Sequence, residues 1–262
     1  MGVKTDITLK ELNTLFEGYS FTKIIPTASG IIDTTYIVHT KTHEYILKYF
    51  ERDIQDRIDA DKKLLKSLKQ AGLNVSEHLQ QSHGWHIYTK LKGKEIKLVK
   101  TFHIQALARF MASMHLQTYK QTNGYNFLDA YDIKNYLIYT KKSHFLYYKK
   151  LSFLNSYKHS CDGVIHGDIF KDNTLFDGSK IAVFDFIDAG CGSFVFDIAV
   201  ALVGFGIKKD NNLFINLFLN TYNQRAIKKI TKQELLDEMG SASGFYALLR
   251  IQKDMKRAKE LL

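Results

Sequence analysis

The spacing of apolar residues along the chain changes near residue 90. Before that point, 34–39 and 44–50 are short runs of β-branched and aromatic residues, and the polar segment between them predicts a β-hairpin. Apolar residues at helical spacing predict a helix over 54–71, with Asp53 placed to cap it. A further strand is predicted at 86–89. The beginning of the chain is therefore expected to be β-rich with one helix.

From about residue 97 onward, the spacing of apolar residues is helical. One amphipathic helix is predicted to end near His115, and Thr231 and Glu234 match a capping box at the start of a later helix. The predicted helices cover about 98–115, 131–157 with an interruption, 193–205, 213–222, a segment from 231, and 241 to the C-terminus. The pattern predicts an α+β protein with a small β-rich lobe, 1–90, and a larger helical lobe, 91–262.

Length and composition limit the class of protein. The chain has 262 residues, and 45% of them are hydrophobic, too many for a disordered protein. No apolar run is long enough to span a membrane, and the N-terminus lacks the apolar stretch of a signal peptide. The two cysteines, Cys161 and Cys191, form no CxxC motif, and in a reducing compartment they are expected to be packed thiols. These features predict a cytoplasmic protein with no membrane partner.

The net charge of +10 raises the question of a nucleic-acid partner. The basic residues are mostly lysines spread along the chain, whereas arginine is the usual bidentate ligand of phosphate and guanine. The six arginines, which form no cluster in the sequence, are Arg52, Arg57, Arg109, Arg225, Arg250 and Arg257. We therefore expect no nucleic-acid partner, although a positive field favours the capture of small polyanions.

The segment 164–186 carries the most chemistry. Two apolar runs, 174–176 and 181–184, flank a polar, Gly-containing stretch typical of a hairpin turn. In such a hairpin, Asn173 and Asp185 face each other at the open end, with Cα atoms roughly 4.5–5.5 Å apart. An amide oxygen and a carboxylate at that distance suit Mg²⁺, and Asp168 can point toward the same place from an upstream turn. Each residue alone could be a turn or cap residue, but the three together predict a metal-dependent site.

A motif in this segment resembles the catalytic loop of protein-kinase-like phosphotransferases. The order His166-x-Asp168-x-x-x-x-Asn173 followed by Asp185 parallels the H-R-D-x-x-x-x-N and D-F-G elements of protein kinases. Gly stands where those enzymes have the arginine, and Ile187 stands where they have the glycine of D-F-G. These departures point away from protein kinases and toward kinases of small molecules.

The continuation of the chain identifies the closer resemblance. Residues 185–192 (DFIDAGCG) and 196–199 (FDIA) are similar to the tail motif of the aminoglycoside phosphotransferase and choline kinase superfamily. Within that superfamily, the segments 30–36 and 166–173 most resemble bacterial homoserine kinases. The resemblance covers nearly the whole chain and is most specific in its central forty residues. It implies a protein-kinase-like fold of two lobes.

The resemblance also implies a site. Asp168 would be the catalytic base, Asn173 and Asp185 would hold Mg²⁺, and Lys48 would bind the α- and β-phosphates of ATP. The family pairs this lysine with a helix glutamate; the predicted helix has none, and Asp61 is preferred to Asp59 as the substitute. Further nucleotide contacts are implied at Ser29, Gly30, Thr89 and Leu91.

Three more residues receive roles from the resemblance. His166 and Asp197 are expected to brace the catalytic loop, and Asp188 is expected to meet the ammonium group of the acceptor. The implied function is the ATP- and Mg²⁺-dependent phosphorylation of a primary hydroxyl, from L-homoserine to O-phospho-L-homoserine in threonine biosynthesis, by a monomer or homodimer. The alternatives are a kinase of choline, an amino sugar or an aminoglycoside, and a catalytically silent nucleotide-binding protein.

Overall fold

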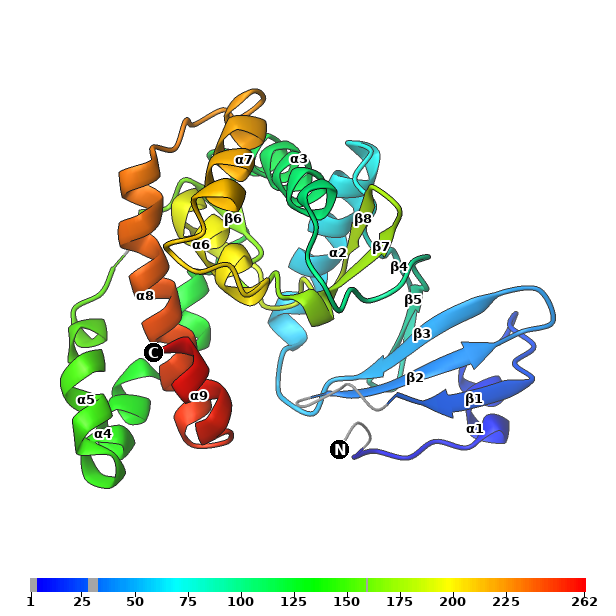
Figure 1. The fold of residues 1–262 in the computed structure, drawn as a ribbon. Coiled ribbons are helices and arrows are strands. Elements are labelled where there is room, and N and C mark those ends of the chain that lie inside the picture. The colour runs from blue at the N-terminus through cyan, green and yellow to red at the C-terminus, as the bar shows by residue number, and fades with distance from the viewer. Residues whose placement is uncertain (1–3, 28–32, 159) are drawn as a thin grey trace. The chain divides into compact units, whose positions relative to one another are not determined.

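A computed structural model describes residues 4–27, 33–158 and 160–262. The chain divides into two compact units, which are treated separately below. Unit 1 combines Met1–Lys94 with Ala182–Ile187, and unit 2 combines Glu95–Ile181 with Asp188–Leu262. Unit 1 contains a five-stranded antiparallel sheet and unit 2 is mainly helical (Figure 1), which confirms the predicted α+β class.

The sheet of unit 1 has the strand order β1-β2-β3-β5-β4. The predicted hairpin is confirmed: β2 and β3 pair in antiparallel register, from Thr34 opposite Tyr49 to His39 opposite Glu44. The predicted strand at 86–89 is confirmed as part of β5, whereas β1 and β4 were not predicted. The strands of this sheet are β1 (Lys23–Pro26), β2 (Thr34–His39), β3 (Glu44–Tyr49), β4 (His78–Ser82) and β5 (Trp85–Thr89).

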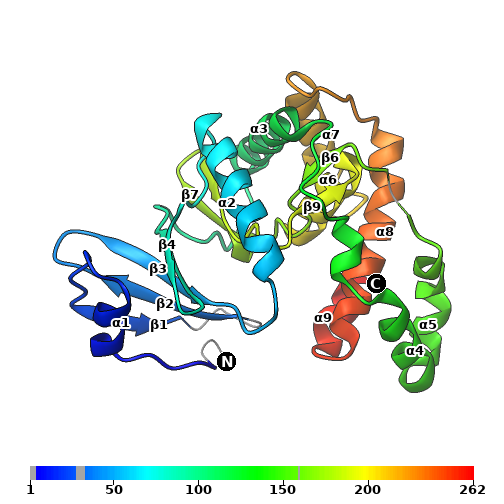
Figure 2. The same cartoon turned by 180° about the vertical axis from the view of Figure 1, so that it is seen from behind.

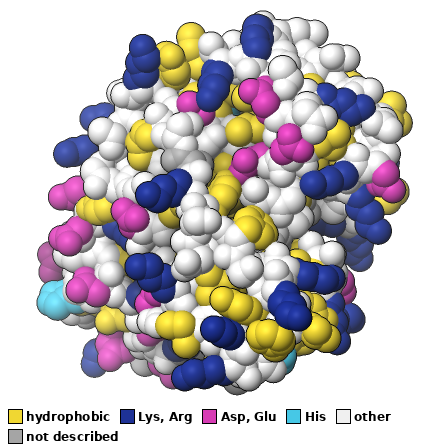
Figure 3. All heavy atoms as spheres, turned by 90° about the vertical axis from the view of Figure 1, so that its left-hand side faces the viewer, with side chains coloured by type: hydrophobic (Ala, Val, Ile, Leu, Met, Phe, Trp, Pro, Cys, Tyr) yellow, Lys and Arg dark blue, Asp and Glu magenta, His cyan; other side chains and the backbone are white. Residues whose placement is uncertain are grey.

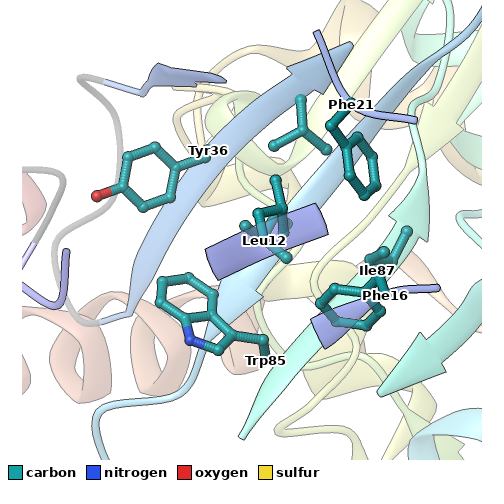
Figure 4. Packing of buried hydrophobic residues seen from close by; sticks show 8 residues of the cluster. Leu12, Phe16, Phe21, Tyr36, Trp85 and Ile87 are labelled. Carbon is teal, nitrogen blue, oxygen red and sulfur yellow. The ribbon is translucent and has the colours of Figure 1, made fainter. Parts of the chain in front are cut away.

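A short helix, α1 (Leu9–Leu15), covers one face of this sheet (Figures 2 and 4). It buries Leu12, followed by Phe16 at its C-cap, against alternate strand residues such as Val38 and Ile87, all four of them fully buried. Because successive side chains of a strand point to opposite faces, the residues between them point away from α1. The α1 side of the sheet is thus a hydrophobic core.

Lys48 lies on the other face of the sheet. It follows Leu47, which packs in the α1 core, and it stands opposite His86, whose neighbour Ile87 is also in that core. Tyr88 of β5 also points to this second face, and its hydroxyl donates a hydrogen bond to Asp61 on the buried side of helix α2 (Gln55–Gln70). Helix α2 therefore lies over this face of the sheet. The helix begins at Gln55, close to the predicted start, but its N-cap is Ile54 and not Asp53 as predicted. The sheet therefore separates a hydrophobic side from the side that carries Lys48.

Unit 2 is built around paired helices. Helix α3 (Thr101–Thr118) packs against α7 (Asn212–Asn223), and α6 (Phe194–Gly204) packs against α8 (Lys232–Ile251) (Figures 1 and 2). The interrupted helix predicted at 131–157 is two helices. The remaining helices and strands are α4 (Ile133–Ser143), α5 (Phe145–Leu151), α9 (Met255–Leu261), β6 (Gly163–Ile165), β7 (Thr174–Asp177), β9 (Gly190–Gly192), and β8 (Lys180–Val183), which pairs with β7 and runs into unit 1.

Two predictions for unit 2 were wrong. The sequence predicted a new helix from about 241, but α8 continues through that region from its capping box at Thr231 to Ile251. The cysteines were predicted to be free thiols, yet Cys161 and Cys191 form a disulfide with their Cα atoms 5.2 Å apart. Pairing of β6 with β9 brings these residues together across 30 positions of sequence, a contact that spacing alone does not indicate.

The basic residues show no single large patch on the face drawn in Figure 3. Lys and Arg side chains are scattered there among acidic and apolar side chains. Among the described residues, no helix has both the length and the apolar character needed to cross a membrane.

Candidate active site

The loop between β6 and β7 fixes the position of Asp168. It contains the short 3-10 helix Lys171–Asn173, which brings Asn173 back toward Asp168. The Asn173 side chain donates from Nδ2 to the backbone oxygen of Asp168 at 2.8 Å and to its carboxylate at 3.0 Å. Both bonds use Nδ2, so Oδ1 is the Asn173 atom with the chemistry of a metal ligand. Two residues singled out by the sequence motif thus meet in the structure.

A buried carboxylate lies beneath this loop. Asp197, at the start of α6, accepts hydrogen bonds from the backbone N–H groups of Gly167 at 2.7 Å and His166 at 3.3 Å. It also accepts from Nε2 of His115 at 3.0 Å, and Nδ1 of that ring lies 2.8 Å from the Tyr222 hydroxyl. All of these side chains are almost completely buried. The hydrogen bonds connect the loop that contains Asp168 to helices α3, α6 and α7.

The His166 ring contributes a bond within the loop. Its Nδ1 lies 3.2 Å from the backbone N–H of Asp168, so that nitrogen accepts and the proton of the neutral ring is on Nε2. This contact and the two bonds to Asp197 are the geometry that a bracing role requires. The role itself remains a prediction for His166 and Asp197.

Gly167 has a conformation that few other residues adopt. Its φ is +75°, and a Cβ added there would clash with the ring of Phe127. The peptide on either side of Gly167 therefore lies closer to the protein interior than a side chain would allow. This close approach lets the Gly167 backbone contact both Asp197 and helix α8.

Helix α8 contributes residues near Asp168 that were not predicted from the sequence. The Tyr246 hydroxyl donates a hydrogen bond to the Gly167 carbonyl oxygen. Burial, and then the Asp168 carboxylate, raise the pKa of Tyr246 well above its usual value, so the hydroxyl stays protonated and remains a donor. Phe170 packs on the Tyr246 ring at 4.8 Å between centroids, and the Arg250 guanidinium lies 4.8 Å from the Phe170 centroid.

Unit 1 holds a second group of site residues. Lys48 forms an ion pair with Asp185, with Nζ 2.6 Å from Oδ1. Asp185 has a φ of +72°, which is uncommon for a residue other than glycine and marks a strained position of the kind found at functional sites. Its side chain is 36% exposed and Lys48 is 14% exposed, so the carboxylate is the more accessible member of the pair.

Asp33 is a further acid near this pair that sequence reasoning missed. It accepts a hydrogen bond from the Glu51 backbone at 3.2 Å and lies 3.4 Å from a guanidinium nitrogen of Arg52. Burial raises its pKa, while Arg52, that backbone bond and Lys48 lower it, and Asp185 raises it further. The signal that could have found it is its position directly after the nucleotide loop predicted at 29–30.

Asp61, predicted to pair with Lys48, lies on the buried side of α2. It is 5% exposed and accepts a hydrogen bond from the Tyr88 hydroxyl at 3.4 Å. Burial and then the Asp61 carboxylate raise the pKa of Tyr88 well above its usual value, so the hydroxyl remains a donor. The pairing of Asp61 with Lys48 remains a prediction.

The other predicted contacts are placed as follows. Thr89 ends β5, and its backbone N–H donates to the carbonyl of Glu77 at 2.9 Å. Leu91 follows this strand and is half-buried, and Asp188 is half-buried in the turn before β9. Ser29 and Gly30 lie outside the described residues. The nucleotide and acceptor roles assigned to these residues remain predictions.

Asn173 and Asp185 fit a magnesium ion by their chemistry. An amide oxygen and a carboxylate are hard oxygen donors, the class that Mg²⁺ takes in proteins. Asn173 belongs to unit 2 and Asp185 to unit 1, so their predicted juxtaposition remains a prediction.

Known proteins resemble this chain in sequence. The sequence model of the phosphotransferase enzyme family matches residues 23–227, which is more than half of the chain. A homoserine kinase of Methylobacillus flagellatus is 26% identical over 260 residues, covering 89% of this chain and 81% of that protein.

Solved structures show the same fold. A choline kinase from Cryptosporidium parvum superimposes with a TM-score of 0.69 at 13% identity, covering 97% of this chain and 91% of that one. The amicoumacin kinase hAmiN, solved with AMP-PNP, Ca²⁺ and amicoumacin, superimposes with a TM-score of 0.66 at 18% identity, covering 96% and 92%. The fold is therefore the protein-kinase-like fold that the motif predicts.

Proposed function

The chain belongs to the phosphotransferase enzyme family and is an ATP-dependent kinase of a small alcohol, and from this premise we propose that its acceptor is L-homoserine. The observation that carries the proposal is the similarity to a homoserine kinase along 89% of the chain. The choline and amicoumacin kinases share the fold at lower identity, and they support no particular acceptor. The product would be O-phospho-L-homoserine, an intermediate of threonine biosynthesis.

Asp168 is the base in this proposal. Its carboxylate would accept a hydrogen bond from the primary hydroxyl of homoserine and take its proton as the oxygen attacks the γ-phosphorus of ATP. A bond forms between that oxygen and phosphorus, the bond from phosphorus to the β–γ bridging oxygen breaks, and ADP leaves with the electron pair. A positioned base of this kind contributes about 10²- to 10⁴-fold to the rate. The bond from Asn173 to the Asp168 carboxylate holds the base in place.

Lys48, Asn173 and Asp185 act on the nucleotide in this proposal. The Lys48 ammonium would hold the α- and β-phosphates, and the oxygens of Asn173 and Asp185 would hold Mg²⁺. The bound ion supplies neutralisation of the negative charge on the phosphate oxygens. Asp188 would receive the ammonium group of the substrate, and Asp61 would support Lys48 from α2. The nucleotide loop at Ser29 and Gly30 and the backbone at Thr89 and Leu91 complete the proposed ATP site.

An acceptor panel tests the proposal. Purified protein with Mg·ATP is assayed for ADP release with L-homoserine, L-serine, L-threonine, choline, ethanolamine or kanamycin, and Asp168→Asn is the control. The proposal predicts release that L-homoserine stimulates most, and loss of that stimulation in the variant. A choline- or kanamycin-dependent reaction would retain the kinase and replace its acceptor. An active Asp168→Asn variant would overturn the role of the base.

A further inference from the structure

Arg250 has an unusual environment for a charged residue. Its guanidinium lies over two aromatic rings, 4.8 Å from the centroid of Phe170 and 5.1 Å from that of Tyr246. Its Nη1 atom is buried and has no hydrogen-bond partner among the described residues. A guanidinium has five N–H donors and no acceptor, so Nη1 can be satisfied only by a group that accepts a hydrogen bond. A buried, charged donor without a partner is unfavourable unless a ligand supplies one.

The aromatic residues that hold Arg250 also contact the loop of the proposed base. Tyr246 lies one helical turn before Arg250 on α8, and its hydroxyl donates to the Gly167 carbonyl. Phe170 follows Asp168 by two residues, and its backbone N–H donates to the Asp168 carbonyl at 2.9 Å. Both rings against the guanidinium therefore belong to, or bond with, the loop that carries Asp168.

The chemistry of this arrangement favours a carboxylate. Aromatic rings beside a guanidinium attract its positive charge and restrict its orientation. The planar group then presents its N–H donors as a fork, which matches the two oxygens of a carboxylate better than any other side chain does. An acceptor whose hydroxyl is bound at Asp168 and whose opposite end is a carboxylate would supply the missing partner of Nη1.

We infer that Arg250 binds the carboxylate of the acceptor, so that the enzyme selects a hydroxy amino acid over a simple amino alcohol. This inference rests on the proposed function and extends it by naming a specificity residue. Choline, ethanolamine and kanamycin carry no carboxylate and would leave the guanidinium unpaired. Selection by a buried donor atom that would otherwise lack a hydrogen-bond partner is a strong form of discrimination.

Two acceptors that differ in one group test this inference. L-homoserine and 3-amino-1-propanol share the hydroxyl and the amine, and only the first has a carboxylate. In Arg250→Met, kcat/KM for L-homoserine should fall by about 10- to 100-fold, as expected for the loss of a hydrogen bond to a charged group. The value for 3-amino-1-propanol should stay within about twofold. Arg250→Lys keeps the charge without the fork and should recover part of the loss.

Controls separate recognition from folding. Arg225 is exposed near the end of α7, and Arg225→Met removes the same charge away from the site, so it should leave both acceptors unaffected. Equal losses for the two acceptors in Arg250→Met, or a raised KM for ATP with an unchanged KM for L-homoserine, would overturn the inference. The first result would indicate a structural role, and the second a role toward the nucleotide phosphates.

A binding measurement keeps the inference independent of turnover. L-2-aminobutyrate is L-homoserine without its hydroxyl, and propylamine lacks the carboxylate as well. Calorimetry should detect binding of L-2-aminobutyrate but not of propylamine to the wild-type protein, with the signal lost in Arg250→Met. If L-2-aminobutyrate binds in this way but L-homoserine is not phosphorylated, the proposed function is wrong while the carboxylate site at Arg250 is supported. No binding of L-2-aminobutyrate to the wild type would overturn the inference itself.

Discussion

Substitution of Asp197 by asparagine should destabilise the protein strongly, because its carboxylate accepts hydrogen bonds from three buried donors. The N–H groups of Gly167 and His166 and Nε2 of His115 all bond to this group, at 2.7, 3.3 and 3.0 Å. An asparagine has one acceptor oxygen, and its NH₂ group would face a donor. At least one buried N–H then loses its partner, and the charge assistance of the others is lost as well.

The size of the effect follows from these contacts. Loss of a hydrogen bond to a charged group costs about 1.5–3 kcal/mol, and an unsatisfied buried donor adds about 1–3 kcal/mol. We therefore expect Asp197→Asn to lower the free energy of unfolding by about 3–5 kcal/mol. The peptides that Asp197 holds flank Asp168, and a base displaced by even a fraction of an ångström reacts slowly, so kcat should fall by about 10²-fold.

Urea unfolding followed by circular dichroism measures the change in stability, and ADP release measures kcat. Asp210→Asn is the matched control, because Asp210 is exposed in the turn before α7 and its change should stay within about 0.5 kcal/mol. A loss below about 1 kcal/mol for Asp197→Asn, with kcat unchanged, would refute the reasoning that this carboxylate braces the loop.

Two further predictions concern unit 1. In Lys48→Met, kcat/KM for ATP should fall by about 10- to 100-fold because the phosphates lose an ammonium partner, whereas the exposed Lys180→Met should retain the wild-type value; equal values for the two variants would contradict the assignment. His78 and His86 lie 3.0 Å apart, and burial is the largest cause that lowers the pKa of each to about 4. Below about pH 6.5 these histidines bind protons in the unfolded chain but not in the folded chain. The free energy of unfolding should therefore decrease as the pH falls from about 6.5 toward 4. The urea midpoint of His78→Gln should therefore depend less steeply on pH than that of the wild type, and an equal slope would refute the assignment.

Much of the local structure could be predicted from sequence because its signals are local. The hairpin at 34–49 has alternating apolar residues and a polar turn, and the capping box at Thr231 and Glu234 begins α8 as predicted. The helix predicted to begin near 241 was wrong, because α8 runs without interruption from Lys232 to Ile251 and contains two glycines, Gly240 and Gly244. A Cβ at Gly244 would lie 3.0 Å from the Phe153 ring, so this glycine permits close contact within unit 2 and does not end the helix.

Without the family resemblance, the site was predictable only where its residues share one segment. Asp168 and Asn173 are five positions apart, and the motif that contains them is visible in the sequence. Tyr246 is 79 positions from Gly167, and no local pattern connects the two. The disulfide between Cys161 and Cys191 was missed for the same reason. Contacts of this kind depend on how helices and strands pack, which spacing along the chain does not reveal.

The central claim is that Asp168 is the base of a kinase whose acceptor is L-homoserine. ³¹P NMR of the purified protein incubated with L-homoserine and Mg·ATP measures the product directly. The account predicts a phosphate monoester signal that grows with the ADP signals, and at least about a 10²-fold slower rate with Asp168→Asn. A monoester formed equally fast by the variant would contradict the role of Asp168, and the absence of any monoester with the wild-type protein would contradict the acceptor.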